Sequence, residues 1–565
     1  MGSQLRVALA QVNPTVGALK LNSDLIVERS LAAYASQAHL VVFPEMVVTG
    51  YPVEDLALRA SFRSASKSMV ADIARRIADG GAGELTVFLG YLDEVAGSTN
   101  RLGQPHGAPQ NALAVIHQGE IKASYAKHHL PNYGVFDEFR NFVPGDSSLV
   151  VRIHGIDVGV AICEDIWQEG GTVAALVNRK PGLVIVPNGS PYERNKDDLR
   201  LALVQKRAKQ IGAPLAYVNM TGGQDDLVFD GDTIVVDGAG NLLARAEQFN
   251  DQLLIVNLDL DAVTSTPDVV ISQDRIEALP PTESTIAPRL EDEAEIWQAL
   301  VVGLRDYVLK NGFAKVALGV SGGIDSALVA AIATDALGAK NVLGIALPSK
   351  YSSDHSLSDA QALAKNLGIE FRTVRIEEMV ESFIVNLTLN GLAEENVQAR
   401  VRGTTLMGIS NQEGHLILAT GNKSELAVGY STLYGDAVGG FAPIKDIYKT
   451  DVWALARWRN TQGSVVIPVN SIDKEPSAEL RPGQKDSDSL PEYSLLDQIL
   501  LRYVDGDASS ADLVAAGFDA GLVARVISLV DKAEYKRRQY PPGTKVSSRA
   551  FGKDRRLPIT SSWRE

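Results

Sequence analysis

The stretch "KVALGVSGGIDSALVAAIATDALG" (residues 315–338) decides the fold of the second half of the chain. An apolar strand pattern runs into Ser321-Gly322-Gly323, and a helical pattern begins at about Asp325. Glycines let backbone N–H groups close around a phosphate, and the start of a helix adds partial positive charge. No lysine follows the glycines, so this is not a loop of the G-x-x-x-x-G-K-[ST] type. The stretch predicts a phosphate-binding loop, against the alternative of an ordinary turn with serine and aspartate caps.

Strand and helix patterns alternate on both sides of this loop. Such an order predicts parallel strands joined by right-handed crossovers, which form a doubly wound parallel sheet. The expected helices cover residues 291–312, 325–337 and 356–367, and the expected strands cover 315–320, 341–348 and 370–376.

The first half of the chain carries a different pattern. Up to about residue 265, nine short β-rich runs alternate with helical patterns such as those at 23–37 and 196–212. Several runs are apolar throughout, as in sheets that are covered on both faces. Residues 266–290 contain a double proline and weak periodicity, which is typical of a connector. We therefore expect domains at 1–265 and 291–565.

Composition narrows the class of protein. A chain of 565 residues is too long for one hydrophobic core, and its net charge of −15 argues against nucleic acid or anionic lipid as a partner. No run of 18 apolar residues and no signal-peptide layout is present, so no membrane partner is expected. One cysteine excludes an intrachain disulfide and a cysteine-based zinc site, which fits a reducing cytoplasm. These features predict a cytoplasmic protein that binds small molecules.

The SGGIDS stretch resembles the SGGxDS motif of the PP-loop ATP-pyrophosphatase superfamily, whose fold is that of the adenine nucleotide alpha hydrolases. Those enzymes adenylate a carboxyl or carbonyl oxygen with ATP, release pyrophosphate, and let nitrogen or sulfur displace AMP. The resemblance implies that Asp325 holds a Mg²⁺ that bridges it to the phosphates. It also implies ATP contacts from Gly319, Val320, Ser321, Gly322, Gly323, Ile324, Asp325 and Ser326.

Residues 395–453, with "ATGNKSE" and "YGD", resemble the core of NAD synthetases, and "KEPSAEL" at 474–480 extends the likeness. The resemblance implies ATP contacts from Thr420 and Lys449, and it places Glu425 with Asp325 at Mg²⁺. Polyphosphate and a nicotinate carboxylate need cations in an acidic protein, whereas an isolated lysine or arginine is usually a surface charge. The residues implied to bind deamido-NAD⁺ are Asn396, Arg400, Glu425 and Lys536.

Two positions depart from the pattern of the small ammonia-using bacterial members. Those members have lysine and aspartate where this chain has Leu433 and Gly440, so we expect its contacts with the dinucleotide to differ in this loop. A polar, proline-rich segment at 470–490 and the basic tail at 534–558 are expected to close over the site.

The only cysteine lies in "GVAICEDIW" (residues 159–167). A thiol that attacks an amide needs a base, a cation for the thiolate and the oxyanion, and a rigid mount. Glu45, Lys127 and Cys163 each follow a predicted strand, and strand ends can converge in a layered α/β domain. Considered alone, each residue has a more ordinary explanation. A buried cysteine is usually a small hydrophobic side chain, Glu45 could be a turn residue, and Lys127 could be a surface charge.

The three segments together resemble the nitrilase, or carbon-nitrogen hydrolase, superfamily, which implies an α-β-β-α sandwich for the first domain. The implied roles are general base for Glu45, oxyanion and thiolate stabiliser for Lys127, and acyl-forming nucleophile for Cys163. A Ser-His-Asp site is not favoured because no G-x-S-x-G motif is present, and His128-His129 lack partners at metal-ligand spacing. The residues implied to bind glutamine are Tyr133, Glu138, Ser190 and Lys196.

The two resemblances imply a ligase that amidates deamido-NAD⁺ with ammonia from glutamine, with ATP and Mg²⁺. One alternative is another glutamine-dependent PP-loop amidotransferase such as a GMP synthetase. A second is a non-catalytic nucleotide-binding or scaffold protein, which the intact SGGIDS and Glu-Lys-Cys sets argue against. Related two-domain enzymes imply a homo-oligomer, from a dimer up to an octamer.

Overall fold

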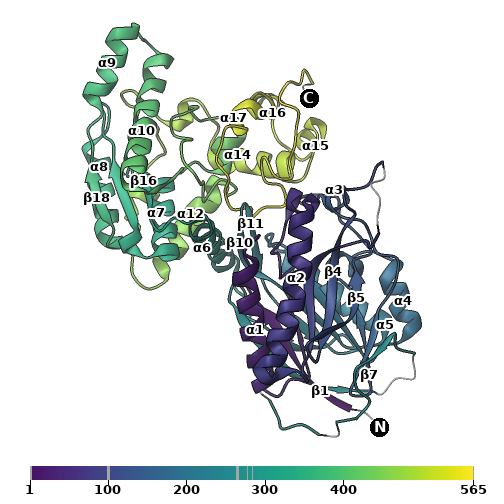
Figure 1. The fold of residues 1–565 in the computed structure, drawn as a ribbon. Helices are drawn as coiled ribbons and strands as arrows, with labels where there is room; N and C mark the ends of the chain where they lie inside the picture. The colour runs from purple at the N-terminus through teal and green to yellow at the C-terminus, as the bar shows by residue number, and fades with distance from the viewer. Residues whose placement is uncertain (1–2, 98–101, 262–265, 277, 283, 564–565) are drawn as a thin grey trace. The chain divides into compact units, whose positions relative to one another are not determined.

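The computed structural model describes residues 3–97, 102–261, 266–276, 278–282 and 284–563 (Figure 1). The chain forms two compact units, Met1–Gln224 with Val228–Leu290 (unit 1) and Asp225–Leu227 with Glu291–Glu565 (unit 2). In the described part of the chain, no helix combines the length and apolar character needed to cross a bilayer.

Unit 1 is built on two sheets. The six-stranded sheet has the order β14-β1-β2-β3-β4-β5, and the seven-stranded sheet has the order β13-β12-β9-β8-β7-β6-β15. The strands of the first sheet are β1 (Ser3–Gln11), β2 (Leu40–Val42), β3 (Thr86–Glu94), β4 (Pro109–His117), β5 (Glu120–Ala126) and β14 (Gln252–Leu260). Those of the second are β6 (Val150–Ile153), β7 (Ile156–Val160), β8 (Leu183–Asn188), β9 (Leu215–Asn219), β12 (Ile234–Val236), β13 (Leu242–Arg245) and β15 (Val269–Val270).

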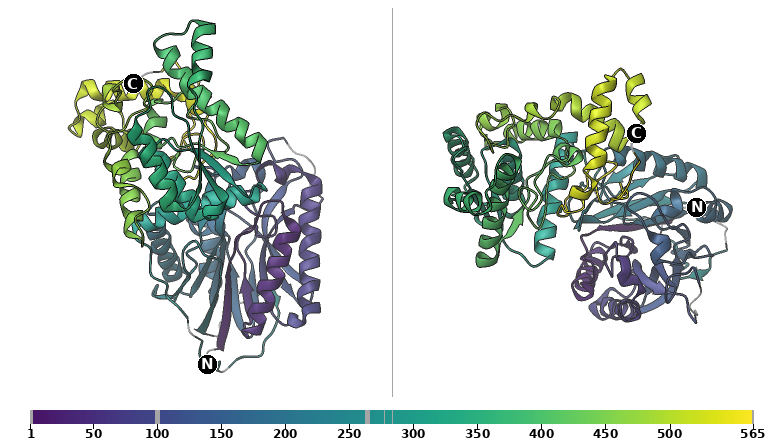
Figure 2. Two further views of the ribbon diagram at one scale, coloured as in Figure 1. Left: turned by 90° about the vertical axis from the view of Figure 1, so that its left-hand side faces the viewer. Right: turned by 90° about the horizontal axis from the view of Figure 1, so that it is seen from above.

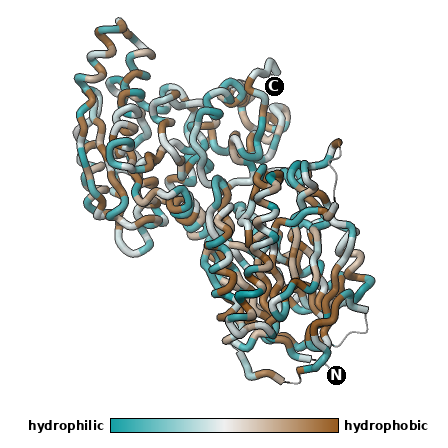
Figure 3. The backbone as a smooth tube through the Cα atoms, viewed as in Figure 1, coloured by the Kyte–Doolittle hydropathy of each residue, from teal (hydrophilic) through white to brown (hydrophobic). Residues whose placement is uncertain are grey.

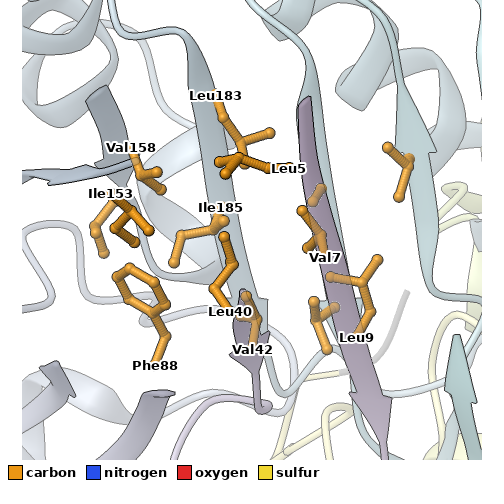
Figure 4. Close-up of a cluster of buried hydrophobic side chains, with 14 of the residues drawn as sticks. Leu5, Val7, Leu9, Leu40, Val42, Phe88, Ile153, Val158, Leu183 and Ile185 are labelled. Atoms are coloured by element: carbon orange, nitrogen blue, oxygen red, sulfur yellow. The ribbon is translucent and has the colours of Figure 1, made fainter. Parts of the chain in front are cut away.

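A continuous apolar core lies between these two sheets. Leu5, Val42 and Phe88 from the first sheet pack in one buried cluster with Val158 and Ile185 from the second (Figure 4). The strands of unit 1 are mostly hydrophobic along their length (Figure 3), as predicted for sheets covered on both faces. Burial of this apolar surface is the main force that holds the two sheets together.

Helices cover the outer face of each sheet. α1 (Leu19–Ala35) and α2 (Ala60–Ile77) lie side by side on the six-stranded sheet (Figures 1 and 2), and share a buried cluster with it. α4 (Gly171–Arg179) and α5 (Lys196–Ile211) pack in the same way on the seven-stranded sheet. The order of layers is α-β-β-α, so the predicted nitrilase-like sandwich is confirmed.

Unit 2 contains the predicted parallel sheet, with the order β18-β17-β16-β19 and all pairs parallel. The prediction of a doubly wound sheet is confirmed. Its strands are β16 (Val316–Gly319), β17 (Val342–Ala346), β18 (Glu370–Thr373) and β19 (Leu416–Leu418). The helices around it are α6 (Asp292–Lys310), α7 (Ile324–Leu337), α8 (Asp354–Leu367), α9 (Glu377–Leu387), α10 (Leu392–Glu413), α11 (Lys423–Val428), α12 (Lys449–Thr461) and α13 (Val469–Asp473).

The end of unit 2 is helical and has a buried cluster of its own. It comprises α14 (Tyr493–Leu500), α15 (Ser510–Ala515), α16 (Ala520–Lys532) and α17 (Glu534–Arg537). The predicted connector contains β15, which pairs in parallel with β6. A hairpin of β10 (Thr221–Gln224) and β11 (Leu227–Asp230) lies outside the predicted strands.

A histidine at the start of β2 makes unit 1 sensitive to acid. The ring of His39 accepts a hydrogen bond from the backbone N–H of Arg6 through Nδ1 at 3.0 Å. Burial, with a smaller contribution from His154, lowers the pKa of His39 to about 4. The folded chain therefore binds this proton less tightly than the unfolded chain, and stability falls as pH drops from about 6.5 through about 4.

We predict that His39→Asn, whose side-chain oxygen can replace Nδ1 as the acceptor, loses less stability than the wild type on acidification. After a discount for the partial exposure of the ring, the difference is roughly 1 kcal/mol. Urea titrations at pH 7 and pH 4.5 measure it. Equal losses in the two proteins would contradict the assignment.

Candidate active sites

Three predicted residues of unit 1 meet at one buried cluster. The ammonium of Lys127, directly after β5, lies 2.7 Å from Oε1 of Glu45 and 2.9 Å from Oε2 of Glu138. All three side chains are almost completely buried. Although burial opposes a charge on Lys127, the Glu138 and Glu45 carboxylates raise the pKa of its ammonium well above the ordinary value. Lys127 is therefore held as a permanent cation.

Cys163 lies three residues after β7, at the first position of a short 3-10 turn (Cys163–Ile166). Its φ of +40° is uncommon for a residue with a side chain, and such strain gathers at functional sites. Burial and the nearby Glu45 carboxylate raise the pKa of the Cys163 thiol, whereas Lys127 lowers it. The thiol is thus neutral at rest, beside both a carboxylate and an ammonium.

Further groups orient the two carboxylates. Asn111 on β4 donates to Oε1 of Glu45 at 2.6 Å, and the backbone N–H of Gly189 donates to Oε2 at 2.8 Å. Burial raises the pKa of Glu138, which accepts the hydroxyl of Tyr51 at 2.9 Å. Sequence patterns missed Asn111 and Tyr51, because neither stands in a distinctive motif.

The other predicted glutamine contacts lie on segments that flank this cluster. Tyr133 donates from its hydroxyl to Glu164, the residue after Cys163, at 2.8 Å. Ser190 follows the Gly189 that contacts Glu45. The ammonium of Lys196 lies 5.9 Å from the centre of the Phe136 ring, in the turn that leads to Glu138. These contacts connect the predicted glutamine residues to the segments that carry Cys163, Glu45 and Glu138.

Unit 2 contains a cavity of about 650 Å³ at the carboxyl ends of β16 and β17, which is where open α/β sheets bind ligands. Most of the residues predicted to bind ATP or deamido-NAD⁺ line it. They are Gly319, Val320, Ser321, Gly323, Ile324, Asp325, Ser326, Asn396, Arg400, Thr420, Glu425, Lys449 and Lys536.

The loop between β16 and α7 is held in shape by its own serines. The hydroxyl of Ser326 accepts the backbone N–H of Ser321 at 3.2 Å, and the hydroxyl of Ser321 accepts that of Gly323 at 3.2 Å. Gly322 has a φ of +81°, and a Cβ there would lie 2.3 Å from the carbonyl oxygen of Ser356. Gly322, which is not among the residues that line the cavity, therefore has a steric role.

We predict that Gly322→Ala weakens ATP binding by about 10- to 100-fold, because the loop must move away from Ser356 as well as accept backbone strain. Gly338→Ala is the matched control, since Gly338 at the other end of α7 has a similar φ of +80° but faces open space. Calorimetric titration with ATP measures both variants. Equal losses of affinity would exclude the collision as the cause.

An ionic cluster lies on the cavity wall. Lys449 is 2.5 Å from Oδ2 of Asp325 and 3.5 Å from Oε1 of Glu425, and Asn422 donates to Oδ1 of Asp325 at 2.8 Å. Burial and the Asp325 charge raise the pKa of Glu425. Burial opposes the charge of Lys449, but the Asp325 and Glu425 carboxylates together outweigh it and raise the pKa of Lys449. Sequence analysis missed Asn422, although it stands in the ATGNKSE stretch.

Another part of the cavity lining comes from α10 and the loop after α11. Arg400 donates to the backbone carbonyl of Leu433 at 3.2 Å, and Lys536 donates to the carbonyls of Gly429 and Ser431 at 2.8 and 2.7 Å. The contact at Leu433 uses the backbone and is independent of its side chain. A Cβ at Gly440 would lie 2.3 Å from Cδ1 of Leu416, so a larger residue there requires the Leu416 side chain to move.

The polar segment at 470–490 begins within α13 and contacts the start of α8. Glu479 accepts the hydroxyl of Ser356 at 2.6 Å and the ammonium of Lys474 at 2.9 Å. Glu479 and nine other residues of this segment also line the cavity.

The chemistry of the donors fits Mg²⁺. Asp325 and Glu425 provide hard carboxylate oxygens on one wall of a cavity that is large enough for a nucleotide, and Mg²⁺ is usually held by one or two carboxylates with substrate phosphates. Within the described ranges, no three or more His, Cys, Asp or Glu side chains gather into a cage made by protein alone.

Comparisons with known proteins match both halves. Residues 6–268 match the family described as Carbon-nitrogen hydrolase, and residues 296–540 match NAD synthase. A glutamine-dependent NAD(+) synthetase from Thermotoga maritima is 43% identical over 100% of this chain and 99% of its own length. One from Xanthomonas campestris is 46% identical over 99% of this chain and 98% of its own length.

Solved structures agree over the same span. The glutamine-dependent NAD⁺ synthetase of Acinetobacter baumannii in complex with adenosine diphosphate is 40% identical, with a TM-score of 0.74 and 99% of each chain covered. That of Cytophaga hutchinsonii has a TM-score of 0.80 over 99% of this chain and 98% of its own, and at 22% identity it supports the fold alone.

Proposed function

Because this chain belongs to the family of glutamine-dependent NAD(+) synthetases, we propose that it amidates deamido-NAD⁺ with ammonia from glutamine. The products are NAD⁺, AMP, pyrophosphate and glutamate. Residues 1–265 form the glutaminase, 266–290 connect, and 291–565 form the synthetase. The observation that carries this proposal is a match over the whole chain, together with one buried Glu-Lys-Cys cluster and one nucleotide-sized cavity.

Glutamine hydrolysis starts with the neutral Cys163 thiol. Glu45 takes the thiol proton as sulfur attacks the amide carbon, and Lys127 stabilises first the thiolate and then the oxyanion. Glu45 returns the proton to the leaving nitrogen, which departs as ammonia and leaves a thioester. Glu45 then deprotonates a water that attacks the thioester, which releases glutamate and restores the thiol.

The contacts around this cluster support the proposed glutamine residues. Glu138 is a second carboxylate in contact with the Lys127 ammonium, so it helps to hold that ammonium in place and to keep it charged. Tyr133, Ser190 and Lys196 lie on the segments next to the cysteine and bind the polar groups of glutamine.

In the synthetase, the nicotinate carboxylate of deamido-NAD⁺ attacks the α-phosphate of ATP, and pyrophosphate leaves. Asp325 and Glu425 would hold a Mg²⁺, whose chemistry is to neutralise charge on the phosphates. The loop from Gly319 to Ser326, with Thr420 and Lys449, positions ATP so that the attack is in line. Asn396, Arg400 and Lys536 bind the dinucleotide, and ammonia displaces AMP.

The direct test supplies the full-length protein with Mg-ATP, deamido-NAD⁺ and glutamine labelled with ¹⁵N in the amide. We expect ¹⁵N in the carboxamide of NAD⁺ and one AMP for each NAD⁺. A parallel assay with XMP tests the GMP synthetase alternative, which the comparisons do not favour. Absence of labelled NAD⁺ with a wild-type protein that binds ATP would exclude the proposal.

We also propose that the protein is a cytoplasmic homo-oligomer, on the basis of its relatives and of its single cysteine. Light scattering of the purified protein gives its mass directly. A mass of one chain, 60.5 kDa, would exclude the assembly.

A further inference from the structure

Asp165 is a fully buried carboxylate that no step of the proposed reaction uses. Its Oδ1 accepts the backbone N–H groups of His128 and His129 at 3.0 and 2.8 Å. Its Oδ2 accepts the hydroxyl of Tyr125 at 2.7 Å and the backbone N–H of Ile162 at 2.9 Å. Both oxygens of this side chain therefore have two donors each.

These four donors come from the two segments that carry the catalytic pair. Tyr125 and the two histidines flank Lys127 at the end of β5, whereas Ile162 immediately precedes Cys163. β5 is an edge strand of the six-stranded sheet, whereas β7 belongs to the seven-stranded sheet. The backbone hydrogen bonds within the sheets therefore do not fix the distance between the ends of β5 and β7. The Asp165 carboxylate spans that gap.

Capping of the 3-10 turn explains only part of this arrangement. The bond to Ile162 is a cap, since it satisfies an N–H at the start of the turn. The other three bonds leave the turn and reach the Lys127 segment. A carboxylate in a water-free interior accepts strong, directional hydrogen bonds. Because an unsatisfied buried charge is costly, the folded protein must keep all four of these bonds.

We propose that Asp165 is a positioning residue that fixes the Lys127 ammonium against the Cys163 sulfur for glutamine hydrolysis. The inference rests on the proposed function. Two backbone N–H groups on one carboxylate oxygen set the orientation of the turn that follows Lys127, and the other oxygen ties that turn to the residue before Cys163. Misplacement of reacting groups by about 1 Å can cost about 100-fold in rate.

The test variant is Asp165→Asn, which keeps the shape but replaces one acceptor by a donor. Whichever way the amide turns, its NH₂ meets at least one backbone N–H, because each oxygen of Asp165 accepts one or more of them. The matched control is Asp157→Asn. Asp157 is also a fully buried acid, on β7 itself, and its carboxylate pairs with Arg152 in the neighbouring strand.

Each variant is assayed for NAD⁺ formation with glutamine and with ammonium, and for the rate of Cys163 alkylation by iodoacetamide against pH. For Asp165→Asn we expect kcat with glutamine to fall by about 10- to 100-fold, with a much smaller change in KM. Alkylation should require a higher pH, because Lys127 no longer stabilises the thiolate. The ammonium reaction should be unchanged, and Asp157→Asn should match the wild type in all three.

Several outcomes would overturn the inference. They are an Asp165→Asn protein that matches the control, an equal loss with ammonium, and an unchanged alkylation profile. If Asp165→Asn does not fold, Tyr125→Phe removes a single donor, and it should give the same effects in weaker form; no effect there would reject the role. Failure of the proposed function is distinct, because it would appear as intact glutamine activity in Cys163→Ala.

Discussion

Cys163→Ala will lose NAD⁺ formation from glutamine by at least about 10⁴-fold while it retains the reaction driven by ammonium chloride. The expected loss is large because alanine offers no nucleophile, so neither Glu45 nor Lys127 has a reaction to assist. The ammonium reaction persists because its proposed groups belong to unit 2. The measurement is NAD⁺ produced from deamido-NAD⁺ and Mg-ATP with each nitrogen source.

Packing must be separated from chemistry in this experiment. Ile166→Val is the matched control, since Ile166 lies in the same 3-10 turn and is fully buried, but it packs in a different apolar cluster from Cys163 and loses only about one methylene. It should keep both activities. Because the chain has one cysteine, iodoacetamide on the wild type should reproduce the alanine phenotype. Equal activity of Cys163→Ala with both nitrogen sources would make Cys163 a packing residue and exclude the glutaminase.

Asp325→Asn will remove NAD⁺ formation with glutamine and with ammonium alike. The amide cannot balance the charge of a divalent cation, and it also leaves the buried Lys449 without its nearest anion. Loss of several kcal/mol of charge stabilisation corresponds to a fall in kcat/KM of about 10²–10³. Steady-state rates across a MgCl₂ titration measure it, and high MgCl₂ should restore part of the activity.

Asp335→Asn provides the control for that prediction. Asp335 lies on the same helix, α7, but is exposed and pairs with Arg459. Surface pairs contribute about 1 kcal/mol or less, so this variant should retain wild-type rates. If Asp325→Asn turns over deamido-NAD⁺ as fast as Asp335→Asn does, Asp325 is not a metal ligand.

Sequence patterns predicted the architecture well where residues close together in the chain determine the structure. The helix expected at 325–337 runs from Ile324 to Leu337, because glycines before it and Gly338 after it define both ends. The strands that flank it are parallel as expected, since a βα alternation leaves few other topologies. The hairpin of β10 and β11 was missed, because its first strand is Thr221–Gln224, a short polar run with two glycines.

Only the site residues that stand in recognisable sequence motifs were predicted. Glu45, Lys127 and Cys163 each follow an apolar strand, which allows them to converge, and the resemblance to the nitrilase superfamily grouped them as one site. The sequence did not single out Asn111, which lies inside a strand, or Asp165, which stands two residues after the cysteine. Hydrogen-bond partners that are distant in sequence leave no local pattern. The need for Gly322 is of the same kind, since the atom it must avoid belongs to Ser356.

Because the Glu-Lys-Cys cluster is divided between two sheets, the packing of the core between those sheets affects catalysis. Glu45 and Lys127 follow strands of one sheet and Cys163 follows a strand of the other, and the apolar layer between the sheets sets their spacing. A substitution in that layer can shift one sheet by about an ångström. The fold tolerates such a shift, but the rate of glutamine hydrolysis falls. Substitutions of Phe88 or Ile185 in this layer are therefore expected to reduce glutamine turnover even where the protein still folds.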